Sequence, residues 1–439
     1  MGILKSLNSS FFQKFKNKPL LVLIFLITSI LITLFLKPFY NSVSILIFIL
    51  AFLTYGFKLK FSFNKTLILP IILYLIMALT LFWTTNFELS LFGLKKESVF
   101  LFLPLTFLFL PKLNSRKVYK IIRLYSFSVI IFAIYCFIKA IVNYSIYKTK
   151  DVFLFHNLVT LDLNAIYIAA FSSLSLFYFI ILKNKKTIDY FGIYILVLFI
   201  TLLNSKTVFF IDFILLIWYY IFFSKTKSGV KSLTIIFVGT FLLLSIFFSN
   251  QLQERIKEEY ETSFVDNTIY KYSDPNQKAY NVSLHQAWSN NEFKKNSFFP
   301  GTAYRVFQVR IFKELLLEQE NIWLIGLGIN SSAQVIKDKH KQHNLFKEYN
   351  YHNFHNQYIQ FFAELGILGF IIFIVMLFLN LKNAIKNKDF LHIVFAVSMI
   401  ILFLTESMLS RQRGIVFFIT LYCLFNAVRY KPDLKIKNI

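Results

Sequence analysis

Long apolar runs constrain this chain more than any other feature of its sequence. Of its 439 residues, 57% are hydrophobic, and the mean hydropathy is +0.60, which is more than a soluble domain needs. The sequence therefore predicts an all-α, polytopic integral membrane protein with about twelve transmembrane helices. The runs long enough to cross a bilayer fall near 20–36, 42–57, 66–86, 98–115, 121–143, 164–182, 187–204, 207–223, 233–249, 356–380, 390–405 and 414–428.

The basic residues predict how these helices are oriented. With the N-terminus inside, 25 Lys and Arg fall on the inner side and 8 in the short outer loops, as the positive-inside rule requires. Both termini are therefore expected in the cytoplasm. The formal net charge of +25 then reflects membrane topology and gives no support for a nucleic-acid partner. The basic segment before the first run is not followed by a small-residue cleavage site, so we expect a retained first helix.

One long polar segment interrupts the apolar pattern, and we expect it on the outer face. Residues 250–354 carry 13 Lys and Arg against 12 Asp and Glu, together with aromatic residues that a disordered linker would lack. We expect a helical cap with an amphipathic helix over 304–320 and a charged helix over 251–261. The predicted domains are helices 1–9 over 1–249, a periplasmic loop domain over 250–355, and helices 10–12 with a cytoplasmic tail over 356–439.

Three polar elements are predicted to meet at the outer surface. His352, His355 and Asn356 stand where the tenth apolar run begins. Lys206 lies in a tight outer turn between two runs, and Arg305 and Arg310 lie on the predicted loop helix. A lipid diphosphate needs fixed cations near the interface. A sugar hydroxyl acceptor benefits from a neutral imidazole within hydrogen-bond reach. The set therefore fits a site that handles a polar group on a lipid-borne substrate.

Each of these residues also has a structural interpretation when it is taken alone. A Lys at the membrane surface often extends its charge towards the headgroups, a loop Arg often forms a salt bridge, and a His at a helix start is often a neighbour of the cap. Charged residues inside predicted helices either pack against each other or face a cavity. For Lys139, Asp212 and Glu364 the sequence leaves both possibilities open.

No metal site or cofactor is predicted. His285, His340 and His343 are expected to be solvated loop residues. The spacing of His340 and His343 could suit a metal, but no carboxylate or third His stands at ligand spacing from them. Both cysteines lie in apolar runs, which favours neither a disulfide nor a zinc site.

Several local patterns, taken in chain order, resemble the O-antigen ligase family of bacterial membrane glycosyltransferases. The most specific is His355-Asn356 followed by Glu364-Leu-Gly366-Ile-Leu-Gly369. The other matching patterns are Phe-Trp83-Thr-Thr-Asn86, Asn164-Ala-Ile-Tyr, Ser205-Lys206, Arg310-Ile-Phe-Lys-Glu-Leu with Trp323 and Gly326-x-Gly328, and Glu406 through Arg411-Gln-Arg-Gly414.

The resemblance implies a metal-independent, inverting transfer of a glycan from an undecaprenyl-diphosphate carrier to an acceptor hydroxyl. Arg310 and Lys206, with Arg305, would hold the diphosphate, and His355 would act on the acceptor, with His352 as the alternative. The supporting residues would be Asn356, Glu364 and Arg411. Lys206 departs from the family pattern, which usually has Arg at this position, so a bidentate contact is replaced by a point charge.

The sequence leaves the acceptor open. A ligase would transfer to a lipid A core, a polymerase of the same architecture to another repeat unit, and a third type to a protein. A lipid-linked glycan transporter or flippase is the alternative from a different class. It predicts inverted repeats and helices broken at the midplane, and the sequence has neither. In every case the expected location is the bacterial inner membrane.

Overall fold

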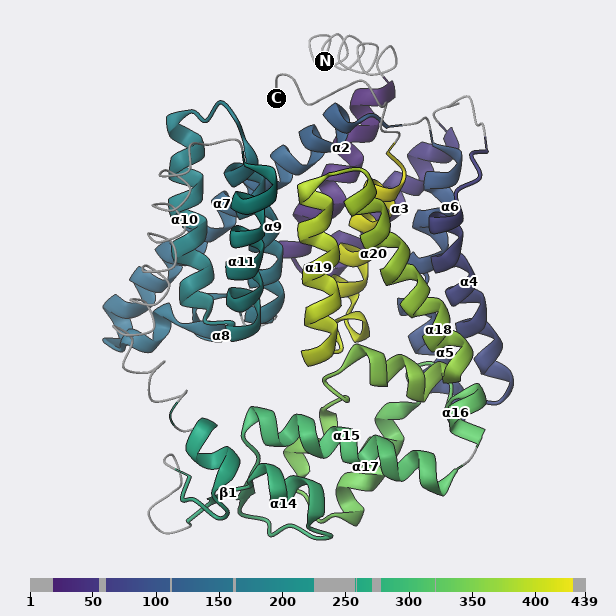
Figure 1. Ribbon diagram of the computed structural model, residues 1–439, viewed down its shortest axis with the longest axis vertical. Helices are drawn as coiled ribbons and strands as arrows, with labels where there is room; N and C mark the ends of the chain where they lie inside the picture. The colour runs from purple at the N-terminus through teal and green to yellow at the C-terminus, as the bar shows by residue number, and fades with distance from the viewer. Residues whose placement is uncertain are drawn as a thin grey trace, which may run out of the picture.

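The computed structural model describes residues 19–54, 61–110, 113–160, 163–224, 257, 259–270, 278–319 and 321–428. The described residues are 78% helical (Figure 1), with most of the long apolar helices above and the polar cap below in that view. We use the word cap for the described residues between 257 and 355.

The bounds of the elements follow the chain. The helices before the cap are α2 (Pro19–Ile32), η1 (Thr33–Phe35), α3 (Pro38–Thr54), α4 (Lys65–Leu79), η2 (Thr80–Phe82), α5 (Phe87–Lys96), α6 (Val99–Phe109), α7 (Ser115–Tyr147), η3 (Lys150–Phe153), α8 (Phe155–Leu158), α9 (Ala165–Ile181), α10 (Thr187–Leu203), α11 (Lys206–Trp218) and η4 (Tyr219–Phe223). The cap contains β1 (Tyr280–Asn281), α14 (Leu284–Ser289), β2 (Ser297–Phe298), α15 (Gly301–Glu318), α16 (Asn321–Ile325), α17 (Ser332–Gln342) and η5 (Lys347–Tyr351). After the cap come α18 (Gln357–Lys386), α19 (Phe390–Thr405), η6 (Met408–Ser410) and α20 (Gln412–Asn426).

The helices coincide with the predicted apolar runs wherever those runs are described. The exception is 233–249, which lies outside the described residues, as do the basic segments at both ends. By length and composition, 4 described helices are able to cross a membrane, and five more apolar helices have 10–17 residues. The all-α membrane class is therefore confirmed, whereas the number of twelve spans stays a prediction. The 4 long helices are Lys65–Phe82, Ser115–Tyr147, Lys206–Phe223 and Gln357–Lys386.

Among the helices that were not predicted from the sequence, α5 lies closest to the membrane helices in chain order. α5 follows the third apolar run, and the side chain of Asn86 caps it by accepting a hydrogen bond from the Leu89 N–H at 3.1 Å. Its last turn carries Lys95 and Lys96, which favour a helix C-terminus. Lys96 Nζ donates to the Ser410 carbonyl at 2.9 Å, so α5 fastens the turn before α20.

The cap has an apolar core of its own. Phe299, Phe307 and Ile311 are buried there together with Phe354, whose chain position already approaches α18. α15 supplies much of this core, which confirms the amphipathic helix predicted over 304–320. The charged helix predicted over 251–261 is described only in part. The two strands pair in parallel, and Ile269 forms an isolated antiparallel bridge with Tyr280 of β1.

A kink in α18 fixes the cap to the membrane helices. Gly366 has φ 67° and ψ −169°, a conformation that is essentially restricted to glycine. At this kink the carbonyls of Ala363 and Glu364 accept hydrogen bonds from the N–H groups of Leu327 and Gly328, at 2.8 and 3.0 Å. The Glu-Leu-Gly and Gly-Leu-Gly patterns noted in the sequence therefore form one joint between α16 and α18.

Candidate active site

His355 is held at the junction between the cap and α18. Its backbone lies in the left-handed region at φ 50°, and its N–H donates to Asn353 Oδ1 at 3.0 Å. The next residue, Asn356, caps α18 by accepting from the Ile359 N–H at 3.1 Å, and its Nδ2 donates to the Leu404 carbonyl at 3.1 Å. Asn356 thus ties the His355 turn to the end of α19, which is a supporting position.

Glu406 connects His355 to Arg305. Glu406 Oε2 lies 3.6 Å from His355 Nδ1, and Oε1 accepts from Arg305 Nη2 at 2.9 Å. Arg305 Nε also donates to the Thr405 carbonyl at 3.0 Å. A carboxylate beside Nδ1 favours the tautomer with its proton on that nitrogen. His355 Nε2 has no hydrogen-bond partner among the described residues, so this tautomer leaves it as the basic nitrogen.

The surroundings of Glu406 keep its carboxylate ionised. Burial alone would raise the pKa of Glu406, but the neighbouring His355 and Arg305 outweigh it, and the pKa lies below its ordinary value. Glu406 is 7% exposed. A buried carboxylate with a depressed pKa is ionised at neutral pH, which orients the imidazole.

His352 lies next to this dyad. Its ring centroid is 5.5 Å from that of His355, and the Tyr304 ring packs against both, at 5.2 and 5.7 Å. Burial lowers the pKa of His352, and the adjacent charges of His355 and Arg411 lower it further. Arg411 therefore approaches the same place from the start of α20. Its side chain makes no hydrogen bond or ion pair in the ranges that the structure describes.

Lys206 is linked to the cap by an ion pair with Glu259. Its Nζ forms an ion pair with Glu259 Oε2, and Glu259 Oε1 accepts from the Thr302 hydroxyl. Burial would raise the pKa of Glu259, but Lys206, Thr302 and Arg305 overcome this and lower it. Lys206, from the start of α11, and Arg305, from α15, thus both act on one carboxylate. The contacts between the α11 turn and the loop helix run from Lys206 through Glu259 to Thr302.

Arg310 is placed elsewhere. Its side chain is buried in the cap, where Nε donates to Glu314 Oε1 at 2.9 Å and Nη1 to the Asn290 carbonyl at 2.6 Å. His343 Nε2 shares Glu314, at 2.9 Å from Oε2. Burial would raise the pKa of Glu314, but His343, Arg310 and Lys339 hold it below its usual range. The structure does not bring Arg310 together with Lys206.

The expectation that three loop histidines are solvated is right for one and wrong for two. His285 is exposed, whereas His340 and His343 are buried. His340 lies against Gln308, with 2.9 Å between the two Nε2 atoms, and is 0% exposed because α17 packs it onto α15. Polar residues of a surface loop become core residues when the loop folds into its own domain, and spacing alone does not report this.

The charged residues inside the helices have local partners. Glu364 is buried and accepts from Ser332 Oγ at 2.6 Å and from Gln360 Nε2 at 2.5 Å. Lys139 Nζ donates to the Val159 carbonyl at 2.8 Å. Asp212 accepts from the Ser173 hydroxyl, while its Oδ2 has no partner among the described residues. Glu364 therefore supports the joint at the α18 kink, away from the Glu406 dyad.

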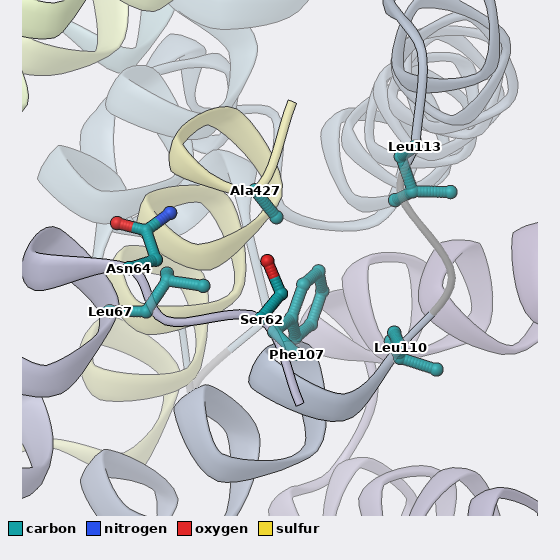
Figure 2. A pocket seen from close by; sticks show the side chains of 7 residues that line it. All are labelled: Ser62, Asn64, Leu67, Phe107, Leu110, Leu113 and Ala427. Atoms are coloured by element: carbon teal, nitrogen blue, oxygen red, sulfur yellow. The ribbon is translucent and has the colours of Figure 1, made fainter. Parts of the chain in front are cut away.

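A small pocket lies at a different place in the molecule. Figure 2 shows its lining from the start of α4, the end of α6 and the end of α20. Asn64 and Ser62 are its polar side chains, and no His, Lys, Arg, Asp or Glu contributes to the described lining. This chemistry does not match the one expected for a diphosphate, so the pocket is not the candidate site.

Sequence reasoning gave no role in the site to three members of the cluster: Glu259, Thr302 and Glu406. Glu259 sits among several acidic residues of a charged stretch, and nothing in that stretch distinguishes it. Thr302 precedes Arg305 by less than one helical turn, and its neighbour Gly301 opens α15. For Glu406 the sequence did contain a signal, because it is the first acidic residue after the eleventh apolar run.

The fold and this cluster define a polytopic helical membrane protein with a His–Glu dyad beside cationic side chains. Residues 190–374 match the family model described as O-Antigen ligase. This match confirms the resemblance to the O-antigen ligase family over these residues, and that family comprises glycosyltransferase-like enzymes of bacterial membranes. The match includes Lys206, the cap and His355, and ends before Glu406. No curated protein matches the chain.

Proposed function

We propose that this protein transfers an oligosaccharide or polysaccharide from an undecaprenyl-diphosphate carrier to an acceptor hydroxyl at the outer face of the inner membrane. The observation that carries the proposal is the linked series from His355 through Glu406 and Arg305 to the carboxylate shared with Lys206. We assign His355 as the base of this site and Arg305 and Lys206 as its cations, at the junction of cap and membrane helices.

In the proposed reaction, His355 Nε2 takes the proton of the acceptor hydroxyl as that oxygen bonds to the anomeric carbon. The bond between this carbon and the phosphate oxygen breaks, and its electron pair leaves with the lipid diphosphate. Glu406 stabilises the imidazolium that forms, by the same logic as the carboxylate of a catalytic triad. Attack opposite the leaving group inverts the anomeric configuration.

The cations have a separate role in the proposal. Arg305 and Lys206 neutralise the diphosphate, which makes it a better leaving group, and Arg411, whose charge acts on the neighbouring His352, adds positive charge. Arg305 replaces Arg310 in this role, because the side chain of Arg310 is already occupied within the cap. No metal or other cofactor is proposed.

Transfer by purified protein tests the catalytic assignment. With a lipid-linked glycan donor and an acceptor, His355→Ala is expected to lower the rate by about 10²–10⁴-fold, the usual range for general acid–base catalysis. Glu406→Gln should also slow transfer while donor binding stays. His285→Ala, on an exposed cap residue, is the matched control and should transfer normally.

Two outcomes would change the assignment. If His352→Ala is inactive and His355→Ala active, the base lies three residues earlier. If both are active, the general-base proposal fails, and the His-Asn pattern serves only to begin helix α18.

The acceptor is a further part of the proposal. We propose a lipid A core, as in an O-antigen ligase, with a repeat-unit polymerase as the second candidate of the same architecture. Glycan analysis of a deletion strain separates them: carrier-linked polymer should accumulate without a ligase, and single uncapped repeats without a polymerase.

A further inference from the structure

Glu259 fills the place that the proposed function gives to the donor. Its carboxylate contacts Lys206 Nζ with one oxygen and the Thr302 hydroxyl with the other, and Arg305 is close enough to affect its charge. A phosphate oxygen presents the same features to the same groups: negative charge, two accepting directions and a fork-binding cation nearby.

We propose that Glu259 is an internal counter-anion that competes with the lipid diphosphate for Lys206 and Thr302, and so sets how tightly donor and product are held. The inference rests on the proposed function of this cluster.

The attachment of Glu259 to the chain suits such a role. It is one of the described helical residues 259–264, among which Tyr260 and Phe264 are each 71% exposed. The stretch is joined to the cap by Asp266, which accepts from the Ser283 hydroxyl, and by Asn267, which accepts from Gln286 Nε2 at 3.0 Å. The Glu259 carboxylate thus belongs to the cap, whereas Lys206 belongs to a membrane helix.

The contact itself is open to exchange. The side chains of Lys206 and Glu259 are 45% and 34% exposed, and an ion pair of this exposure contributes little to stability. Glu406, by contrast, is buried between His355 and Arg305. A carboxylate in the exposed position can give way to a ligand of higher charge without leaving a buried charge unpaired.

The charge of the two lipid species explains why competition would be useful. The donor carries its diphosphate as a diester, whereas the product, after the glycosyl bond is broken, carries a free terminal phosphate with more negative charge. Fixed cations alone would hold the product more tightly than the donor. A carboxylate that returns to Lys206 would favour release of the product.

Binding of undecaprenyl diphosphate to the full-length protein in detergent micelles tests the inference. Glu259→Gln is expected to tighten binding about two- to fivefold, the scale of one partly exposed ion pair. It should lower, by a similar factor, the concentration at which undecaprenyl diphosphate inhibits transfer. Glu261→Gln is the matched control: it lies on the same stretch, is ion-paired only with Lys257 in the described ranges, and should bind as wild type does.

The outcomes separate this inference from the proposed function. If Glu259→Gln binds undecaprenyl diphosphate as weakly as wild type or more weakly, Glu259 is a positioning partner of Lys206 and the competition is refuted. If Lys206→Ala and Arg305→Ala bind it as tightly as wild type, the cluster is not the diphosphate site. The proposed function then fails, and the competition inference with it.

Discussion

Arg305 and Arg310 show what decides a role at the scale of single residues. They lie on one helix, but residues five apart on an α-helix point about 140° away from each other. One therefore reaches Glu406 and the other Glu314. The sequence shows two basic residues on an amphipathic helix. It does not show which of them points to the membrane helices, because the rotation of α15 is set by how its apolar side packs in the cap.

The two arginines are predicted to fail in different ways. Arg305→Ala should abolish transfer, and it should also lower stability because the buried Glu406 loses its guanidinium partner. Arg305→Lys keeps a charge beside Glu406, so it should fold as wild type does and retain part of the activity, because a fork becomes a point charge. Arg310→Ala should lower the stability of the cap by about 1–3 kcal/mol, since it leaves the Asn290 carbonyl without its donor. Glu314 also loses one partner but keeps His343 and Lys339. Transfer assays and thermal unfolding of the same preparations provide the measurement. An Arg310→Ala protein of normal stability that cannot transfer would return the diphosphate role to Arg310.

The histidines follow the same logic. His355 and Asn356 could be located from the sequence because they begin an apolar run, a boundary that composition marks clearly. Burial of His340 and His343 could not, since it depends on α17 packing onto α15. Their polar neighbours Gln308 and Glu314 lie on that other helix, far away in the sequence.

At the scale of elements, composition predicted the apolar helices well and their irregularities poorly. The runs around α4, α7 and α18 are long enough to leave no alternative to helix. The kink inside α18 was not predicted, because Gly366 stands within a predicted membrane helix and glycine is common in such helices. What reveals the kink is a contact with α16, which lies some 40 residues earlier in the chain.

Gly366→Ala should disrupt this joint. A Cβ at this position would lie 2.3 Å from the Leu324 carbonyl oxygen, and the backbone conformation alone costs a non-glycine residue on the order of 1–3 kcal/mol. We expect the cap to separate more readily from α18, faster limited proteolysis between α15 and α17, and slower transfer. Leu368→Ala, an exposed position on the same helix, is the control. Equal proteolysis of the two variants would contradict the role given to the kink.

At the scale of the whole molecule, the cap is predicted to lose stability in mild acid. Burial lowers the pKa of His340 to about 4, with His352 and His343 contributing. In the unfolded cap, His340 would take up a proton at about pH 6.5. In the folded cap it does so only at about pH 4. Stability from this group is complete above pH 6.5 and falls as the pH drops towards 4, by about 3 kcal/mol over the whole window.

The measurement is the unfolding temperature between pH 7 and 5. This range lies above the pKa of Glu314, whose depressed value removes stability only at lower pH. His340→Gln, which cannot take up a proton, should flatten the pH dependence, and His285→Gln should leave it unchanged. A His340→Gln protein with the wild-type slope would show that another group, with His352 the first candidate, accounts for the acid sensitivity.

The orientation of the whole chain is the last prediction, and it rests on the distribution of Lys and Arg alone. If 250–354 is outside and both termini are inside, a membrane-impermeant thiol reagent added to intact spheroplasts should label Ser289→Cys. It should label Asn184→Cys only after permeabilisation. Both positions are exposed, and the native Cys136 and Cys423 are buried and should stay silent. The reverse pattern would place His355, Glu406 and Lys206 on the cytoplasmic side of the membrane. The proposed reaction at the outer face would then have to be abandoned.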